Sequence, residues 1–172
     1  YLSESPEEYL RFVGEAKGLR GSALQEQIQD VIRQTGIEAV KGRRIAGLSK
    51  GYRQRVGIAQ ALLGSPKAII LDEPTVGLDP MQIIEIRELI KELGKQHTVI
   101  FSSHILSEVQ TICDQELIIA NGKLAAFDRP ETLEKRLLSS NEILVVPDAP
   151  QKEAMAILES LPHITHIQAE EE

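Results

Sequence analysis

The feature that most constrains the fold is an apolar run followed by a helical pattern and a second apolar run. Residues 67–71 read Lys-Ala-Ile-Ile-Leu, which is typical of a strand buried on both faces of a parallel sheet. Asp79-Pro80 predicts the start of a helix, and Thr98–Phe101 predicts a second buried strand. The inward side chains of that helix are predicted to be Ile83, Ile86, Ile90 and Leu93. Strand, helix and strand at this spacing form one right-handed crossover, so the sequence predicts an α/β fold with a parallel sheet.

Further helices are predicted along the chain, both before and after this unit. Ser5-Pro6 predicts the start of the first helix, Ser22 with Gln25 predicts a capping box for a second, and a third runs roughly over 52–63. After the second strand we expect a helix near 105–112, a hairpin over 116–127 around Asn121-Gly122, and a helix from Pro130 to about residue 138. The tail predicts a small β-α-β piece, with strands over 143–146 and 164–168 and a helix over 151–161.

Composition excludes several classes of protein. The 172 residues carry a net charge of −7, which makes broad, sequence-independent nucleic-acid binding unfavourable. No apolar run approaches the ~18–20 residues that a membrane span needs. The single Cys113, predicted to be a small buried hydrophobe, excludes an internal disulfide framework and a multi-cysteine zinc site. The charge is uneven, because Lys41–Arg55 holds six basic residues and no acidic one. That stretch is either a solvated basic face or a surface that meets phosphate.

Two adjacent carboxylates, Asp72 and Glu73, follow the first predicted strand directly. In open α/β sheets, ligands bind off the carboxyl ends of the strands. One carboxylate there would suit a hydrated Mg²⁺, and the other would suit a water molecule that must be oriented or deprotonated. The alternative is an Asp-Glu pair that caps a turn before Pro74.

The segment Leu48–Arg55 leads into the third helix and suits phosphate binding. Ser49 offers a hydroxyl, and Gly51 lets the backbone come close to a ligand. The helix behind them presents free N–H groups and the positive end of its dipole to an anion. A plain helix start would also use Ser and Gly, so this alternative stays open.

Four motifs in order resemble those of an ABC-type ATPase. They are Leu48–Leu62 (the signature loop), the strand ending in Asp72-Glu73 (Walker B), Gly77-Leu78-Asp79-Pro80 (the D-loop) and Ser102-Ser103-His104 (the switch histidine). The sequence LSKGYRQRVGIAQAL is similar to the signature motif in ATP-binding subunits of bacterial exporters of the gliding-motility and multidrug type. The resemblance covers about residues 1–140 and implies part of a P-loop NTPase core with a parallel sheet and a helical subdomain.

The resemblance also implies a role for each matched residue. Asp72 would help to hold Mg²⁺ through water, Glu73 would be the general base, and His104 would contact the γ-phosphate; the alternative for His104 is a satisfied polar residue. Ser49 and Gly51 would bind the γ-phosphate of ATP held by an opposite subunit.

The remaining matched residues belong to the same interface. Asp79 would cross the dimer interface, although Asp79-Pro80 is also a good helix start and both readings can hold. Lys50 and Tyr52 of the signature loop replace its commonest Gly and Gln, which alters side-chain contacts at the binding loop but keeps Ser49 and Gly51.

One motif of the family is absent from the sequence. A P-loop needs Gly, four residues, then Gly-Lys and Ser or Thr, and neither Gly94-Lys95 nor Gly122-Lys123 fits. We therefore expect the C-terminal portion of a longer protein, inactive alone. The expected parts are residues 1–140 of the ATPase domain, with a helical subdomain at about 1–63 and the catalytic half of the sheet at about 64–140. Residues 141–172 would begin a C-terminal appendage.

The function implied by the resemblance is that of an Mg-dependent ATPase subunit that powers export. Its partners would be a second ATP-binding subunit, as a homodimer, and a separate membrane permease, with the protein in the cytoplasm on the inner face of the cell membrane. No nucleic-acid partner is expected. Two alternatives stay open: a soluble, non-transport ABC ATPase, or a non-catalytic interaction module that completes a partner's ATP site.

Overall fold

The computed structural model describes the chain except residues 139–144, 146–149, 162–166 and 168–172. The chain divides into two compact units, Tyr1–Pro130 and Glu131–Glu172, and each is described by itself. The predicted domain boundary after residue 140 falls within residues 139–144, which are outside the described residues, so it stays a prediction.

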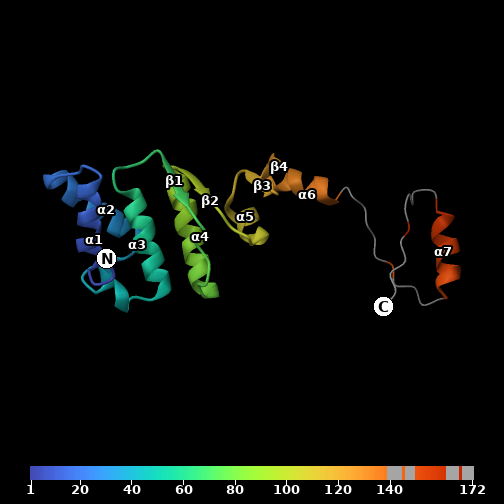
Figure 1. Cartoon of the computed structure of the whole chain (residues 1–172), viewed down its shortest axis with the longest axis horizontal. Coiled ribbons are helices and arrows are strands. Elements are labelled where there is room, and N and C mark those ends of the chain that lie inside the picture. The colour runs from blue at the N-terminus through green and yellow to red at the C-terminus, as the bar shows by residue number, and fades with distance from the viewer. Residues whose placement is uncertain (139–144, 146–149, 162–166, 168–172) are drawn as a thin grey trace. The chain divides into compact units, whose positions relative to one another are not determined.

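Three helices pack together at the start of the first unit: α1 (Pro6–Ala16), α2 (Gly21–Thr35) and α3 (Lys50–Leu62) (Figure 1). Their shared core is fully buried at Leu10, Ile28 and Ala59, which are 0% exposed. The loop between α2 and α3 contains two short 3₁₀ turns, Glu38–Val40 and Ile45–Gly47, which also contribute buried side chains. The contact between helices thus comes from apolar side chains spaced along each helix, as the sequence predicts.

The first helix start is as predicted and the second is not. Ser5 caps α1 in a complete capping box with Glu8, and Gly36 ends α2 in the left-handed conformation. The capping box predicted for Ser22 was wrong, because α2 begins at Gly21 after Arg20, with no side-chain cap. Gly21 adopts φ 59°, which a glycine reaches at little cost, so the helix begins earlier and Ser22 lies inside its first turn.

The predicted crossover unit is confirmed. Strands β1 (Ala68–Leu71) and β2 (Thr98–Phe101) pair in parallel, with α4 (Pro80–Gly94) between them along the chain (Figure 1). The register places Ala68 opposite Thr98 and Leu71 opposite Phe101. On α4 the buried side chains are Ile86, Leu89, Ile90 and Leu93.

The expectation that these strands are buried on both faces was wrong for the chain as described. Burial alternates along β1: Ile69 is 2% exposed, whereas Ile70 is 76% exposed. On β2, Ile100 is 56% exposed. Helices α3 and α4 contact this small sheet, and alternate side chains point away from the covered face. A continuous apolar run predicts the strand but not which layers cover it.

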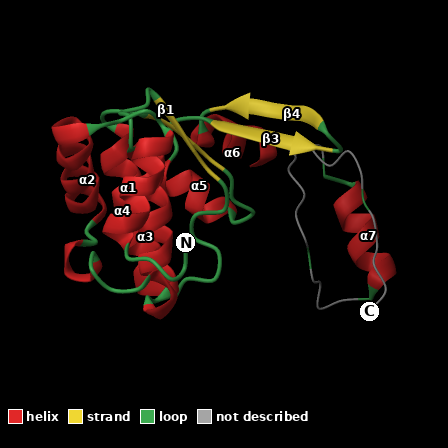
Figure 2. Ribbon diagram, turned by 60° about the vertical axis from the view of Figure 1, so that its left-hand side comes forward, coloured by secondary structure: helices red, strands yellow, loops and turns green. Residues whose placement is uncertain are grey.

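The elements after β2 match the predicted order. They are α5 (Leu106–Ile112), the hairpin strands β3 (Glu116–Ala120) and β4 (Lys123–Asp128), α6 (Pro130–Leu138) and α7 (Gln151–Glu159). Figure 2 shows β3 and β4 as an antiparallel pair. Their turn has positive φ at Asn121 and Gly122, as the Asn-Gly signal predicts. The strands predicted over 143–146 and 164–168 fall mainly on stretches outside the described residues.

Candidate functional site

The carboxyl ends of β1 and β2 bring Asp72 and Ser102 together. The parallel register makes Leu71 and Phe101 partners, so the residues that follow them lie level with each other. The Ser102 hydroxyl donates to Asp72 Oδ1 at 2.6 Å and accepts from the Glu73 backbone N–H at 2.9 Å. One hydroxyl therefore fixes both members of the Asp72-Glu73 pair. The sequence placed Ser102 within a motif but gave it no role; its position directly after a strand end was the available signal.

Glu73 and His104 form a direct pair at the same edge. His104 Nδ1 lies 3.0 Å from both carboxylate oxygens of Glu73. The hydrogen bond and charge of Glu73 raise the pKa of His104 above its ordinary value, so the protonated imidazole is favoured. Glu73 has φ 46°, a left-handed backbone that is unusual for a residue other than glycine. The turn thus holds the Glu73 side chain, 35% exposed, where it meets His104.

Ser49, Lys50, Gly51 and Tyr52 lie at the start of α3, as predicted. Ser49 is the N-cap, and its hydroxyl accepts from the Tyr52 backbone N–H at 3.3 Å. Gly51 is buried beneath the side chain of Gln82: a Cβ built there would lie 2.8 Å from Gln82 Cδ. Gln82 is a contact residue that sequence reasoning missed, because it depends on packing between segments far apart in the chain.

The turn that contains Asp79 packs against the same helix start. The Asp79 side chain accepts from the Gln82 backbone N–H at 3.0 Å and so caps α4, which confirms the helix-start reading. The Lys50 ammonium lies against Gly77, where an added Cβ would overlap it. The structure therefore joins residues 49–52 to residues 77–82. No hydrogen bond or ion pair between described residues joins residues 49–52 to Asp72, Glu73 or His104.

A cleft of about 340 Å³ opens at this helix start. It is lined by Gly36, Ser49, Gly51, Tyr52, Arg55, Gln82, Glu85 and Ile86. Arg55 donates to the Thr35 carbonyl and to Glu85, both at 2.8 Å, and Arg53 donates to the Leu48 carbonyl at 2.7 Å. The basic stretch is thus only partly a free surface, because Arg53 and Arg55 fix the surrounding loops.

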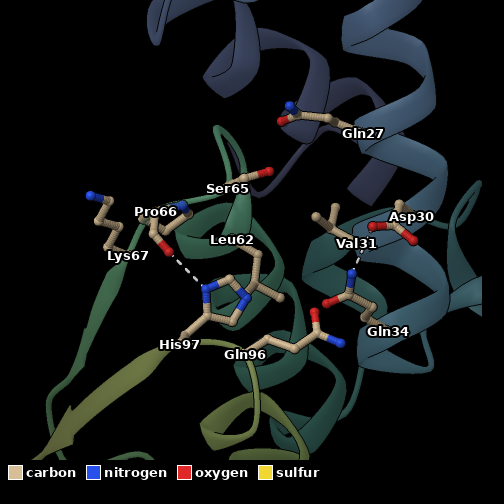
Figure 3. Close-up of a pocket in the computed structure, with 10 residues that line it drawn as sticks. All are labelled: Gln27, Asp30, Val31, Gln34, Leu62, Ser65, Pro66, Lys67, Gln96 and His97. Carbon is tan, nitrogen blue, oxygen red and sulfur yellow. Dashed lines mark hydrogen bonds between the residues drawn. The ribbon is translucent and has the colours of Figure 1, made fainter.

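A second cleft of about 290 Å³ lies at the opposite, amino ends of the strands (Figure 3). Its wall includes Lys67 and His97, the residues that precede β1 and β2. His97 Nδ1 lies 2.7 Å from the Pro66 carbonyl, and Asp30 accepts from Arg33 and Gln34. Several of its polar groups thus bond within the chain, and the cleft lies at the strand ends where ligands do not bind in open α/β sheets.

The oxygen atoms of Asp72 and Ser102 at the strand ends suit a hard cation whose remaining ligands are water and phosphate oxygens. The described residues contain no group of three or more His, Cys, Asp or Glu side chains able to enclose a metal. Asp72 is exposed and contributes one carboxylate beside the Ser102 hydroxyl, as Mg²⁺ bound mainly by water and phosphate oxygens requires.

Burial, with Glu116 and Asp114 nearby, raises the pKa of Cys113 to about 11, so that thiol stays protonated at neutral pH.

The sequence of this chain is similar to the sequences of known ATP-binding proteins. The family described as ABC transporter matches residues 3–76. The uncharacterized ABC transporter ATP-binding protein YxlF of Bacillus subtilis is 41% identical over 118 residues, which cover 69% of this chain and 40% of YxlF. The bacitracin transport ATP-binding protein BcrA of Bacillus licheniformis is 42% identical over 118 residues, which cover 67% of this chain and 39% of BcrA.

A solved structure agrees with these matches. The structure of cbiO1 from Clostridium perfringens, part of the ABC transporter complex cbiONQ, superimposes with a TM-score of 0.71 at 32% identity. The match covers 80% of this chain and 57% of that one. The chain belongs to the family of ABC transporter ATP-binding subunits. It spans about 40% of the length of the two relatives named above.

Membership of the ABC ATP-binding family confirms the predicted fold class, an α/β nucleoside-triphosphatase core with a parallel sheet. Every helix in the described part of this ABC subunit is too short or too polar to cross a membrane.

Proposed function

We propose that this chain is part of an ATP-binding subunit that hydrolyses ATP to drive export through a separate permease. The observation that carries the proposal is the Glu73–His104 pair, held by Ser102 at the carboxyl ends of two parallel strands. Family membership supports ATP hydrolysis in the full-length protein. Because this sequence has no P-loop motif, the fragment alone is proposed to be inactive.

Glu73 is proposed to accept a proton from the attacking water. Its carboxylate lies partly exposed, 3.0 Å from His104, which keeps it oriented before nucleotide arrives. His104 is proposed to contact the γ-phosphate, where its raised pKa favours the positive imidazole. Asp72 would hold Mg²⁺ through water, and that ion would neutralise charge on the phosphate oxygens.

Residues 49–52 and Asp79 are proposed to act on a nucleotide held by a second copy. Ser49 and Lys50 are exposed at the N-terminus of α3, where the helix dipole favours an anion. Gly51 is covered by Gln82, and Gly51 and Tyr52 both line the same cleft. Asp79 caps α4, a role compatible with contact across the dimer.

The proposed partners are a second ATP-binding subunit, as a homodimer, and a membrane permease, with no nucleic acid. The protein would lie in the cytoplasm on the inner face of the cell membrane. Two names support a transport role: BcrA is described as a bacitracin transport protein, and cbiO1 as part of a transporter complex.

The experiment compares Glu73→Gln with Glu88→Gln in the full-length protein. Glu88 is an exposed glutamate on α4 that forms an ion pair with Lys91, so it is a matched control. Loss of a general base lowers turnover by ~100- to 10,000-fold, and Glu73→Gln should retain ATP-dependent dimerisation. Glu88→Gln should hydrolyse ATP like the wild type.

Two results would contradict the proposal in different ways. Hydrolysis at the wild-type rate in Glu73→Gln would exclude Glu73 as the base. A wild-type full-length protein without Mg-dependent ATPase activity would exclude the catalytic function and favour the non-catalytic interaction module.

A further inference from the structure

Glu108 is a buried carboxylate outside the proposed chemistry. It lies on α5 and is 2% exposed. Burying a charged carboxylate costs free energy unless other groups pair with it. Its partners therefore indicate what the residue is for.

The partners of Glu108 come from three separate segments. Thr75 Oγ1 donates to Glu108 Oε2 at 2.6 Å, and Ser103 Oγ donates to the same oxygen at 3.2 Å. Arg87 Nη2 of α4 lies 3.4 Å from Glu108 Oε1. Thr75 is itself buried, 4% exposed, so its hydroxyl exchanges little with solvent.

These partners adjoin the two residues of the catalytic pair. Thr75 is two residues after Glu73, and Ser103 directly precedes His104. One oxygen of Glu108 therefore anchors both the turn that carries Glu73 and the loop that carries His104. Ser103 also accepts from the Ile105 backbone N–H at 3.0 Å, which fixes the shape of the loop at His104.

We propose that Glu108 is a positioning residue that holds the Glu73 turn and the His104 loop at the separation required for hydrolysis. The inference rests on the proposed ATPase function and adds a residue to it. Glu108 does not touch the reacting atoms; it acts through Thr75 and Ser103. Arg87 balances the charge of Glu108 through the ion pair from its Nη2.

A purely structural role makes a different prediction. If Glu108 only stabilised the fold, its variants would lower the unfolding temperature and lower activity only through loss of folded protein. A positioning role lowers kcat in folded protein while ATP binding is retained, because the chemical step depends on geometry that ground-state binding does not need.

The test measures kcat, the Kd for Mg-ATP and the unfolding temperature of the full-length protein. Thr75→Val removes the hydroxyl while nearly preserving shape, and Thr75→Ser keeps it. Thr111→Val is the matched control. Thr111 is exposed on α5, the helix that carries Glu108, and its hydroxyl donates to the Ser107 carbonyl at 2.6 Å. Glu108→Leu is the second variant, in case Thr75→Val does not fold, because leucine cannot accept from either hydroxyl.

Thr75→Val should lower kcat by about 10- to 100-fold, the scale that misplacement of catalytic groups produces, with the Kd for Mg-ATP within about twofold of wild type. Thr75→Ser should restore kcat, and Thr111→Val should leave it unchanged. In Glu108→Leu, the additional Thr75→Val change should have little further effect, because leucine accepts no hydrogen bond and the shared interaction is already lost.

Wild-type kcat in folded Thr75→Val and Glu108→Leu, beside an inactive Glu73→Gln, would overturn this inference and leave the proposed function intact. Loss of activity that follows loss of folded protein would also overturn it. Absence of ATPase activity in the wild type would instead overturn the proposed function, and this inference with it.

Discussion

Gly51 allows a sharp test, because α3 contains a second glycine in different surroundings. A Cβ at Gly51 would meet three atoms of the Gln82 side chain at 2.8 to 3.2 Å, whereas a Cβ at Gly57 would have nothing within 4 Å. In a helix interior, alanine is favoured over glycine by roughly 0.8–1.0 kcal/mol. Gly57→Ala should gain this free energy in full. In Gly51→Ala, displacement of Gln82 offsets the gain by about 0.5–1.5 kcal/mol if that side chain leaves its rotamer.

The assay is thermal unfolding of the full-length protein without nucleotide. A gain of about 1 kcal/mol raises the unfolding temperature by roughly 2–4 °C for a domain of this size class. Gly57→Ala should show that rise and Gly51→Ala should show little. In a Gln82→Ala background, Gly51→Ala should regain stability, with a coupling of about 0.5–1 kcal/mol.

The same variants test the function of the cleft. In a Glu73→Gln background that retains ATP, Gly51→Ala should lose ATP-dependent dimerisation, measured by light scattering, because its methyl group displaces Gln82 and so changes the space inside the cleft that both residues line. Gly57→Ala should dimerise normally. Equal stabilisation by both alanines, with no coupling to Gln82, would refute the packing described here. Normal dimerisation of Gly51→Ala would refute the role of that space.

Four further substitutions test the helical part of the first unit by urea denaturation. Leu10→Ala, at a fully buried position, should lower the free energy of unfolding by about 2–5 kcal/mol. Phe12→Ala, at a position that is 66% exposed, should change it by less than about 0.5 kcal/mol. Equal losses in the two variants would contradict the assigned core. Lys17→Met should cost about 1 kcal/mol, because its ammonium donates to carbonyls at the end of α3, two of them at 2.8 Å; an unchanged stability would exclude that cap. Hydrogen bonds from Ser5 lower the pKa of Glu8, so its stabilising contribution is present above the ordinary glutamate pKa and is lost as pH falls through the lowered value in the folded state. Glu8→Gln should remove that acid dependence, and an unaltered pH profile would contradict it.

Local patterns in the sequence predicted local structure well. The cap at Ser5, the turn at Asn121-Gly122 and the position of Asp72 after a strand each depend on a few consecutive residues, and each is found as predicted. Their physical causes, side-chain capping and left-handed turn preference, act within one turn of chain. The capping box at Ser22 failed because a competing start at Gly21 used the same few residues.

Non-local contacts were beyond prediction from one sequence. The bond from Ser102 to Asp72 spans 30 residues and depends on the strand register, which no local pattern specifies. The cluster around Glu108 depends on how α5 packs against α4 and the turn after β1. The exposure of Ile70 depends on which layers cover the sheet, and the apolar run at residues 67–71 does not specify those layers.

The register of β1 and β2 has a consequence for which insertions and deletions the protein can tolerate. Each residue of a parallel strand advances the chain by about 3.3 Å, so a one-residue slip would carry Ser102 beyond hydrogen-bond reach of Asp72 and turn the strand's side chains to the opposite face. A two-residue slip would restore the face but double the displacement. Added or lost residues within 68–71 or 98–101 should therefore inactivate the protein, whereas changes in the exposed linker at Lys95 and Gln96 can be absorbed while the strands keep their pairing. In functional variants of this chain, insertions and deletions should therefore be confined to the loops that connect its helices and strands.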